Sequence, residues 1–361
     1  MGQSVTDKMT AIGADQKIAD FIVKQKQDYK FKKAYARIRA KEFYNECCSR
    51  DLNCHVSVGG LDSITLFLFL KSIGIDVPGI SVSHLEDKSI QTIHKQLGIE
   101  HIPPIKKSDG TTWRKSSIIQ EFGFPVLSKE IAGKIETLAN PTSKNATVRH
   151  AIITGETGAY GGFRKNTRMK MSQKWLEKFG GYENENEDVN YQIPDFKVSA
   201  KCCYYLKEKP CDDWAKKNNS VPYLGLMASE GGRRQKSLMI NGCNYFGKST
   251  TRSAPFAIFN RQDILQLALE LEVPVPAIYG IIEQKEDGTL YTTKAQRTGC
   301  SMCGFGIHLE KRPHRFDRLY KDNPKEWDYW MYRCVTDKDG EKYGWGKVLD
   351  YIGVGWRQNG G

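Results

Sequence analysis

The sequence has no apolar run long enough to span a membrane. The longest such run covers residues 64–70, far short of the ~18 residues that a transmembrane helix needs. The first residues, MGQSVTDKMTAIGADQ, contain no apolar core of the kind found in a secretory signal. A fixed-period repeat and a low-complexity tract are also missing. We therefore expect a cytoplasmic globular protein with no membrane partner.

Acidic residues are in deficit. The 361 residues include 42 aspartates and glutamates against 54 lysines and arginines, which gives a formal net charge of +12. This excess favours a polyanionic partner such as a nucleotide or nucleic acid. A merely basic enzyme is the alternative, because the basic residues are spread along the chain. The length suffices for one large or two medium domains.

Cysteine, in contrast, is abundant. With ten cysteines and no secretory signal, a reducing compartment is expected, where a disulfide framework is improbable. The tandem pair Cys202-Cys203 and the CxxC formed by Cys300 and Cys303 would together supply four thiolates, and the single Cys243 could replace one of the tandem pair. Zinc and a [4Fe–4S] cluster both accept such ligands. Buried cysteines without a metal are the alternative.

Strand-like and helix-like segments alternate along much of the chain. Residues 15–50 have a helical pattern, residues 53–58 and 77–83 are strand-like, and helical patterns follow each strand at 63–72 and 88–99. This alternation predicts an α/β fold with a doubly wound, mainly parallel sheet. Further along, the pattern predicts a helix before Pro274 and a hairpin at Asp287-Gly288.

The same pattern predicts three regions. We expect an N-terminal helical segment over residues 1–50 and a nucleotide-binding domain over 51–290. That domain would carry a long insertion at about 103–198, where the alternation stops and glycine-rich stretches appear. A helical C-terminal region over 291–361 would contain the CxxC.

The stretch SVGGLDS, residues 57–63, joins the first strand to its helix. Its two glycines would let the backbone approach an anion closely, and the helix that follows offers N–H groups and the positive end of its dipole. The turn is not of the Walker form, because it lacks the GxxxxGK[ST] pattern. A tight turn in which Ser63 caps the helix is the alternative explanation.

Several segments together resemble the phosphoadenosine phosphosulfate (PAPS) reductase family of the adenine-nucleotide α-hydrolase, or PP-loop, superfamily. They are VSVGGLDS, YLGLMASEGGRR, APFAIFNRQDILQLALELEVPVPAIYG, and KCCYYLKEKP with GCSMC. KCCYYLKEKP and GCSMC resemble the segments that hold the [4Fe–4S] cluster in the adenylyl-sulfate reductase branch. The resemblance covers about residues 54–308 and implies a PP-loop fold with a bound nucleotide.

The resemblance also implies a set of site residues. The nucleotide would be cradled by Ser57, Gly59, Gly60, Asp62 and Ser63, and its phosphate or sulfate end would be contacted by Arg233 and Arg234. Asp62 and Ser63 are the candidate catalytic residues. The expected ligands of a [4Fe–4S] cluster, or of zinc as the second choice, are Cys203, Cys243, Cys300 and Cys303, with Cys202 as the alternative to Cys243. The nucleotide would be ATP or a sulfonucleotide, and Mg²⁺ is a further candidate.

Three departures from the family pattern bear on activity. Val58 stands where the family has a serine, and Leu61 stands where a lysine is common. No cysteine follows Cys334, so the nucleophilic thiol of sulfonucleotide reductases is missing. We therefore expect ATP-dependent substrate activation or sulfur transfer, with nucleic acid or a sulfur-transfer protein as the partner. The alternatives are a non-catalytic nucleotide- or nucleic-acid-binding module, and a sulfonucleotide reductase that uses an external thiol.

Overall fold

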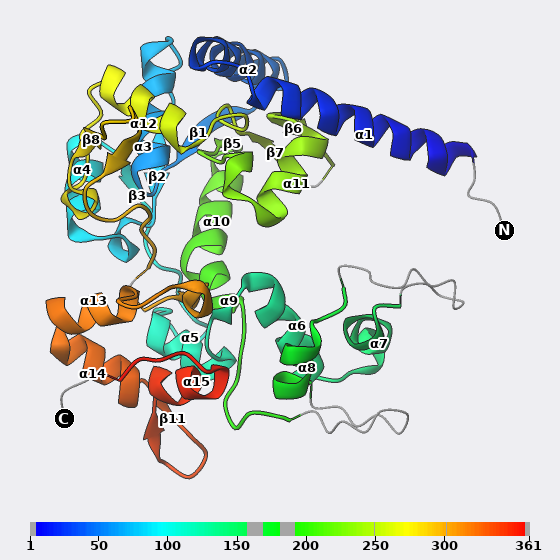
Figure 1. Ribbon diagram of the computed structural model, residues 1–361, viewed down its shortest axis with the longest axis vertical. Coiled ribbons are helices and arrows are strands. Elements are labelled where there is room, and N and C mark those ends of the chain that lie inside the picture. The colour runs from blue at the N-terminus through cyan, green and yellow to red at the C-terminus, as the bar shows by residue number, and fades with distance from the viewer. Residues whose placement is uncertain (1–4, 157–168, 181–191, 249, 301, 358–361) are drawn as a thin grey trace. The chain divides into compact units, whose positions relative to one another are not determined.

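The computed structural model describes residues 5–156, 169–180, 192–248, 250–300 and 302–357, with residues 5–14, 232 and 233 described by their backbone alone. The chain divides into two compact units (Figure 1). Unit 1 comprises Met1–Pro103 and Lys209–Cys300, and unit 2 comprises Pro104–Glu208 and Ser301–Gly361. Each unit is thus built from two separate stretches of the sequence.

Unit 1 contains a six-stranded sheet in the order β3-β2-β1-β5-β7-β6. Its strands are β1 (Asn53–Ser57), β2 (Gly79–Ser81), β3 (Glu100–His101), β5 (Ser220–Tyr223), β6 (Asn244–Phe246) and β7 (Thr251–Ser253). All neighbours pair in parallel except β6, which is antiparallel to β7. The predicted α/β class with a mainly parallel central sheet is confirmed.

The strand order reverses between β1 and β5. From β1 the chain proceeds to β2 and then β3 on one side, and it later forms β5 and β7 on the other side. In open α/β sheets, a crevice forms at the carboxyl ends of the strands where the order reverses, and ligands bind there. Helix α3 (Leu61–Ser72) begins directly after β1, so the glycine turn lies at this position.

Helices are present in unit 1 at the predicted segments 15–50, 63–72, 88–99 and before Pro274. The helices of this unit are α1 (Val5–Gln25), α2 (Tyr29–Ser49), α3, α4 (Lys88–Gln96), α10 (Lys209–Lys217), α11 (Gly232–Asn241) and α12 (Arg261–Glu270). Of these, α10 and α11 were not predicted. The N-terminal helical segment is split into two helices, because the Asp28 side chain accepts a hydrogen bond from the Phe31 N–H at 2.8 Å and starts α2 there. None of the described helices is both long and apolar enough to cross a bilayer.

The predicted hairpin at Asp287-Gly288 is confirmed. Strands β8 (Ile282–Gln284) and β9 (Leu290–Thr292) pair antiparallel on either side of it. Gly288 has a positive φ of 82°, a conformation that favours glycine. The local turn signal in the sequence was therefore sufficient to locate this element.

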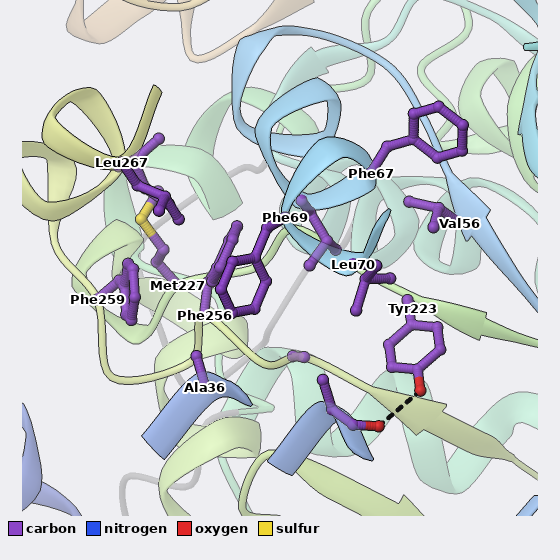
Figure 2. Packing of buried hydrophobic residues seen from close by; sticks show 14 of the residues in the cluster. Ala36, Val56, Phe67, Phe69, Leu70, Tyr223, Met227, Phe256, Phe259 and Leu267 are labelled. Carbon is purple, nitrogen blue, oxygen red and sulfur yellow. Dashed lines mark hydrogen bonds between the residues drawn. The ribbon is translucent and has the colours of Figure 1, made fainter. Parts of the chain in front are cut away.

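Helix α3 is apolar all round because it is enclosed by the core of unit 1. Ile64, Leu66 and Leu70 are fully buried, and the Phe69 ring lies 5.4 Å from that of Phe256 (Figure 2). Tyr223 is the last residue of β5, the strand next to β1. Its hydroxyl donates a hydrogen bond to the Ala40 carbonyl at 2.8 Å. This bond ties β5 to α2.

Two ion pairs connect α2 to α12. The Lys32 ammonium lies 2.8 Å from the Asp263 carboxylate, and both side chains are buried. The neighbouring pair, Lys33 with Glu270, spans 2.6 Å and is partly exposed. Asp263 also accepts a hydrogen bond from the Asn260 N–H at 2.7 Å, so its carboxylate is held by two partners.

Unit 2 is mainly helical. Its helices are α5 (Lys115–Phe122), α6 (Lys129–Ala139), α7 (Ala146–Thr154), α8 (Gln173–Phe179), α9 (Lys201–Cys203), α13 (Arg315–Asp322), α14 (Pro324–Tyr332) and α15 (Trp345–Ile352). Strand β4 (Val126–Leu127) pairs in parallel with β10 (Gly304–Phe305), and β11 (Val335–Thr336) pairs antiparallel with β12 (Lys342–Tyr343).

One hydrophobic core joins the two stretches of unit 2. The rings of Phe124 and Trp345 lie 5.0 Å apart, and the ring of Phe316 lies 5.4 Å from that of Trp345. The expected insertion at 103–198 and the expected C-terminal region at 291–361 therefore both contribute to this unit. The N-terminal segment 1–50 belongs to unit 1.

The two α2–α12 ion pairs allow a matched test of how burial changes the cost of breaking an ion pair. Lys32→Met leaves the Asp263 carboxylate buried without its charge partner, and we expect it to lower the free energy of unfolding by about 3–5 kcal/mol. Lys33→Met removes the exposed pair and should cost less than about 1 kcal/mol. Urea denaturation followed by circular dichroism measures both. Equal losses of unfolding free energy in the two variants would contradict the conclusion that Lys32–Asp263 is buried and Lys33–Glu270 is exposed.

Candidate functional site

The glycine turn between β1 and α3 is held by Ser63. The Ser63 hydroxyl accepts a hydrogen bond from the Gly59 N–H at 2.7 Å and donates one to the Gly60 carbonyl at 2.9 Å. Gly60 is the N-cap of α3, and no side chain caps the helix in its place. Ser63 therefore fixes the shape of the turn at the start of α3.

The two apolar residues of the turn face the core. Val58 is 5% exposed and Leu61 is 1% exposed, and both belong to the hydrophobic core of unit 1. A Cβ built on Gly79 would lie 3.2 Å from a methyl group of Val58, which shows how closely β2 packs against it. These side chains anchor the turn from behind.

His94 supports the turn from α4, a contact that the sequence pattern did not predict. Its Nε2 lies 2.8 Å from the Gly59 carbonyl oxygen, and its Nδ1 lies 2.9 Å from the Ser83 hydroxyl. Because a carbonyl can only accept, Nε2 carries the proton and Nδ1 accepts from Ser83. Burial lowers the pKa of His94, which favours this neutral form. The only signal in the sequence was that His94 follows the apolar Ile90 by one helical turn.

Tyr279 covers the turn from the other side. Its hydroxyl accepts a hydrogen bond from the Leu61 N–H at 3.2 Å and lies 2.8 Å from the Thr298 hydroxyl. A Cβ on Gly60 would come within 2.2 Å of the Tyr279 oxygen, so the close approach requires glycine there. Tyr279 is 4% exposed, and burial raises its pKa. The hydroxyl is therefore neutral at ordinary pH.

Gly225 brings the loop after β5 against the same turn. A Cβ at Gly225 would lie 3.1 Å from the Ser63 Cα and 3.2 Å from the Asp62 carbonyl group. The loop after β5 and the start of α3 are thus in direct contact at the point where the strand order reverses. This contact brings YLGLMASEGGRR next to SVGGLDS, although about 160 residues separate them in the sequence.

Charged groups gather beside α3. Arg261 of α12 forms an ion pair with Asp62. Burial raises the pKa of the Asp62 carboxyl, and the Arg261 guanidinium opposes that rise. The Nε and Nη2 atoms of Arg261 are buried and have no hydrogen-bond partner among the described residues. Beside the Asp62 carboxylate, Arg261 thus has two buried donors without a partner in the described part of the chain.

Glu230 lies at the end of the loop after β5 and collects two further arginines. Its carboxylate lies 2.9 Å from an Arg234 nitrogen and 3.7 Å from an Arg297 nitrogen. The negative charge of Glu230 also contributes to the raised pKa of Asp62. Of the two predicted arginines, Arg234 is exposed and bound to Glu230, and the side chain of Arg233 lies outside the described residues.

The expected metal-binding cysteines are distributed over both units. Cys243 and Cys300 belong to unit 1, and Cys202, Cys203 and Cys303 belong to unit 2. Cys203 interacts with Lys129, and the thiolate would help to raise the pKa of that lysine. Among the residues that the structure describes, no group of three or more His, Cys, Asp and Glu side chains is arranged to hold a metal ion.

Cys243 has a different environment from the other cysteines in this set. It is 3% exposed within the core of unit 1, and the Tyr35 hydroxyl is its hydrogen-bond partner. Burial raises the pKa of its thiol to about 11. It also borders a cavity of about 230 Å³ between α1 and α11.

A second glycine-containing stretch resembles a phosphate-binding loop in sequence, and the structure shows whether it has that fold. Residues 242–248, GCNYFGK, together with the next residue Ser249, match the Walker pattern GxxxxGK[ST]. A phosphate-binding loop of that kind joins a strand to the start of a helix. Here residues 244–246 of the stretch form β6, which pairs antiparallel with β7, and the Gly247 N–H donates to the Thr250 carbonyl at 2.9 Å. Strands β6 and β7 form a β-hairpin and not the strand-to-helix turn of a phosphate-binding loop, and so the pattern is coincidental.

Comparison of the chain with models of known protein families, with curated proteins and with solved structures gives no match.

The Gly225 contact can be tested by stability. Gly225→Ala places a methyl group against the backbone of α3, and we expect it to lower the free energy of unfolding by about 1–3 kcal/mol. Gly299→Ala is the control, because a Cβ there has no neighbour within 4 Å, and it should change stability by less than about 0.5 kcal/mol. If Gly225→Ala is as stable as the control, the close contact is wrong.

Proposed function

We propose that unit 1 binds the phosphates of an adenine nucleotide at the β1–α3 turn, as PP-loop proteins of the PAPS reductase family do. The observation that carries the proposal is the position of Gly59, Gly60, Asp62 and Ser63 at the start of α3, where the strand order of a parallel sheet reverses. Helix N-termini bind anions through their N–H groups and dipole, and nucleotides bind at such reversals in α/β sheets.

The surrounding side chains suit a phosphate ligand. The Arg261 donors without a partner match phosphate oxygens, because a guanidinium presents its N–H groups as a planar fork. Asp62 would bind Mg²⁺ through its carboxylate oxygens, and Ser63 would hold the glycine turn in its phosphate-binding shape through its two hydrogen bonds. Ser57 at the end of β1 and the two arginines at the start of α11 complete the proposed nucleotide set.

Val58 and Leu61 do not argue against this function. Their side chains lie in the core, so neither replaces a donor on the exposed side of the turn. The turn would bind phosphate mainly through its backbone, for which the identity of these two side chains is immaterial. This favours a functional site over the alternative of a degraded one.

We further propose that the bound nucleotide is ATP and that it activates a substrate for sulfur transfer. In such an activation, a substrate oxygen attacks the α-phosphorus, the bond to the bridging oxygen breaks, and pyrophosphate leaves. Arg261 and the N–H groups of α3 would stabilise the charge that develops on the phosphates. The net charge of +12 suits nucleic acid as the sulfur acceptor, and a sulfur-transfer protein is the alternative acceptor.

A pair of serines on α3 tests the nucleotide site. Ser63→Ala removes the hydroxyl that shapes the turn, and we expect ATP to bind about five- to ten-fold more weakly by isothermal titration calorimetry, the loss of roughly one hydrogen bond. Ser72→Ala, at the other end of the same helix, removes a hydroxyl bonded to the Phe69 carbonyl and should leave binding unchanged.

Pyrophosphate release then separates an enzyme from a binding module. We expect release from ATP by the wild-type protein in the presence of an acceptor, and none by Asp62→Ala. Tight ATP binding with no release under any condition would instead favour the non-catalytic module. Release of sulfite from a sulfonucleotide in the presence of an added thiol would favour the reductase.

An iron–sulfur cluster bound by Cys203, Cys300, Cys303 and one further cysteine is also proposed. The support is the chemistry of the donors, since four thiolates are the ligand set of a [4Fe–4S] cluster and also suit zinc. The position of Cys243 in the core of unit 1, where its hydrogen-bond partner is Tyr35, favours Cys202 as the fourth ligand. Such a cluster would supply electron transfer or an iron site that carries sulfur.

The metal and its fourth ligand are decided by one set of variants. We expect iron and inorganic sulfide in protein purified without oxygen, a loss of both in Cys202→Ser, and full retention in Cys243→Ser. Stoichiometric zinc in a colourless protein would contradict the cluster. Loss of iron in Cys243→Ser with retention in Cys202→Ser would reverse the choice of ligand.

A further inference from the structure

Tyr279 occupies the position at which a phosphate would meet α3. Its hydroxyl accepts the hydrogen bond of the Leu61 N–H, which is the first N–H group of the helix, and it packs directly on Gly60. One N–H group forms a strong, linear hydrogen bond with only one acceptor at a time. A phosphate that bound to the Leu61 N–H would therefore have to displace the Tyr279 hydroxyl.

We propose that Tyr279 is the gate of the phosphate site and that Thr298 couples this gate to the segment leading to Cys300. The inference deepens the proposed function and rests on it. A phosphate oxygen is charged and is a stronger acceptor than a neutral hydroxyl, so the ligand wins the exchange. The lost Tyr279 bond is then a fixed cost, which lowers the affinity for any ligand that carries a phosphate.

The gate is connected to its neighbours by backbone bonds. Tyr279 ends the short helical turn η5 (Ala277–Tyr279). The Lys294 N–H donates to the Tyr279 carbonyl at 3.0 Å, and the Ala295 N–H donates to the Ile278 carbonyl at 3.2 Å. With the side-chain contact to Thr298, residues 277–279 and 294–298 therefore form one bonded assembly.

Gly280 joins this assembly to the segment that leads into the β8–β9 hairpin. It has a positive φ of 75°, and a Cβ on it would lie 2.1 Å from the Thr293 hydroxyl. The assembly is thus attached to the β8–β9 hairpin through a residue that only glycine suits. When the gate opens, the motion passes to residues 294–298 and on to Cys300, two residues beyond Thr298. Coupling of this kind is reciprocal, so a change at Cys300 would also alter nucleotide affinity.

Tyr279→Phe tests the gate, because it removes the hydroxyl and keeps the buried ring. We expect ATP to bind about five-fold more tightly to this variant, since the Leu61 N–H no longer has a bond to break. Adenosine, which carries no phosphate, should bind with unchanged affinity. Tyr291→Phe is the matched control, because it removes a hydroxyl bonded to Glu283 on the β8–β9 hairpin. Thr298→Val, which removes only the second partner of Tyr279, should shift ATP affinity in the same direction by a smaller factor.

Hydrogen exchange tests the coupling. We expect ATP to increase amide exchange in residues 294–300 of the wild-type protein. In Tyr279→Phe, exchange there should already be raised without ATP. Unchanged exchange in both experiments would overturn the coupling to Cys300.

The binding outcomes separate this inference from the proposed function. ATP binding that is tighter in Tyr279→Phe, or is seen only in that variant, supports the gate. ATP binding by the wild-type protein that is unchanged or weaker in Tyr279→Phe overturns the gate and leaves the nucleotide site in place. If the wild-type protein and all three variants fail to bind ATP, the proposed function is wrong and the gate falls with it.

Discussion

The fold of unit 1 and the arrangement of its candidate site depend on the parallel pairing of β1 with β5. These strands are separated by more than 160 residues, yet they pair over four positions, from Asn53 opposite Ser220 to Val56 opposite Tyr223. The pairing is reinforced by a hydrogen bond between His55 and Ser220 at 2.8 Å in the buried interior. Because β1 leads into the glycine turn and β5 leads into the Gly225 loop, this register determines which residues meet at the crevice.

The glycine turn is held by contacts on every side, and the resulting rigidity would favour ligand binding. Core packing of Val58 and Leu61, the His94 hydrogen bond to Gly59 and the internal bonds of Ser63 give the backbone one conformation. A preorganised site loses less conformational entropy when its ligand arrives. The Tyr279 hydroxyl acts in the opposite direction, because it satisfies the N–H group that the ligand would use. The affinity for a phosphate ligand would therefore depend on the gain from preorganisation less the cost of breaking the Tyr279 hydrogen bond.

Two carboxylates and three arginines around the turn form ion pairs. Asp62 is paired with Arg261, and Glu230 is paired with Arg234 and Arg297. Each carboxylate near the start of α3 thus neutralises part of the positive charge that would attract phosphate. A divalent cation that bound to Asp62 would release Arg261 for a phosphate oxygen, so metal and nucleotide would be expected to bind cooperatively.

The sequence by itself determined the local features. It identified the α/β class, the strand–glycine turn–helix unit at residues 53–72 and the Asp287-Gly288 hairpin, because hydrophobic period and turn chemistry are set by neighbouring residues. Only the tertiary structure decided which distant residues meet the turn. His94, Gly225, Arg261 and Tyr279 come from four other segments, and no local pattern records a contact across a sheet. The Walker-like stretch shows the same limit, since its residues match a phosphate loop while the strand pairing around them makes a hairpin.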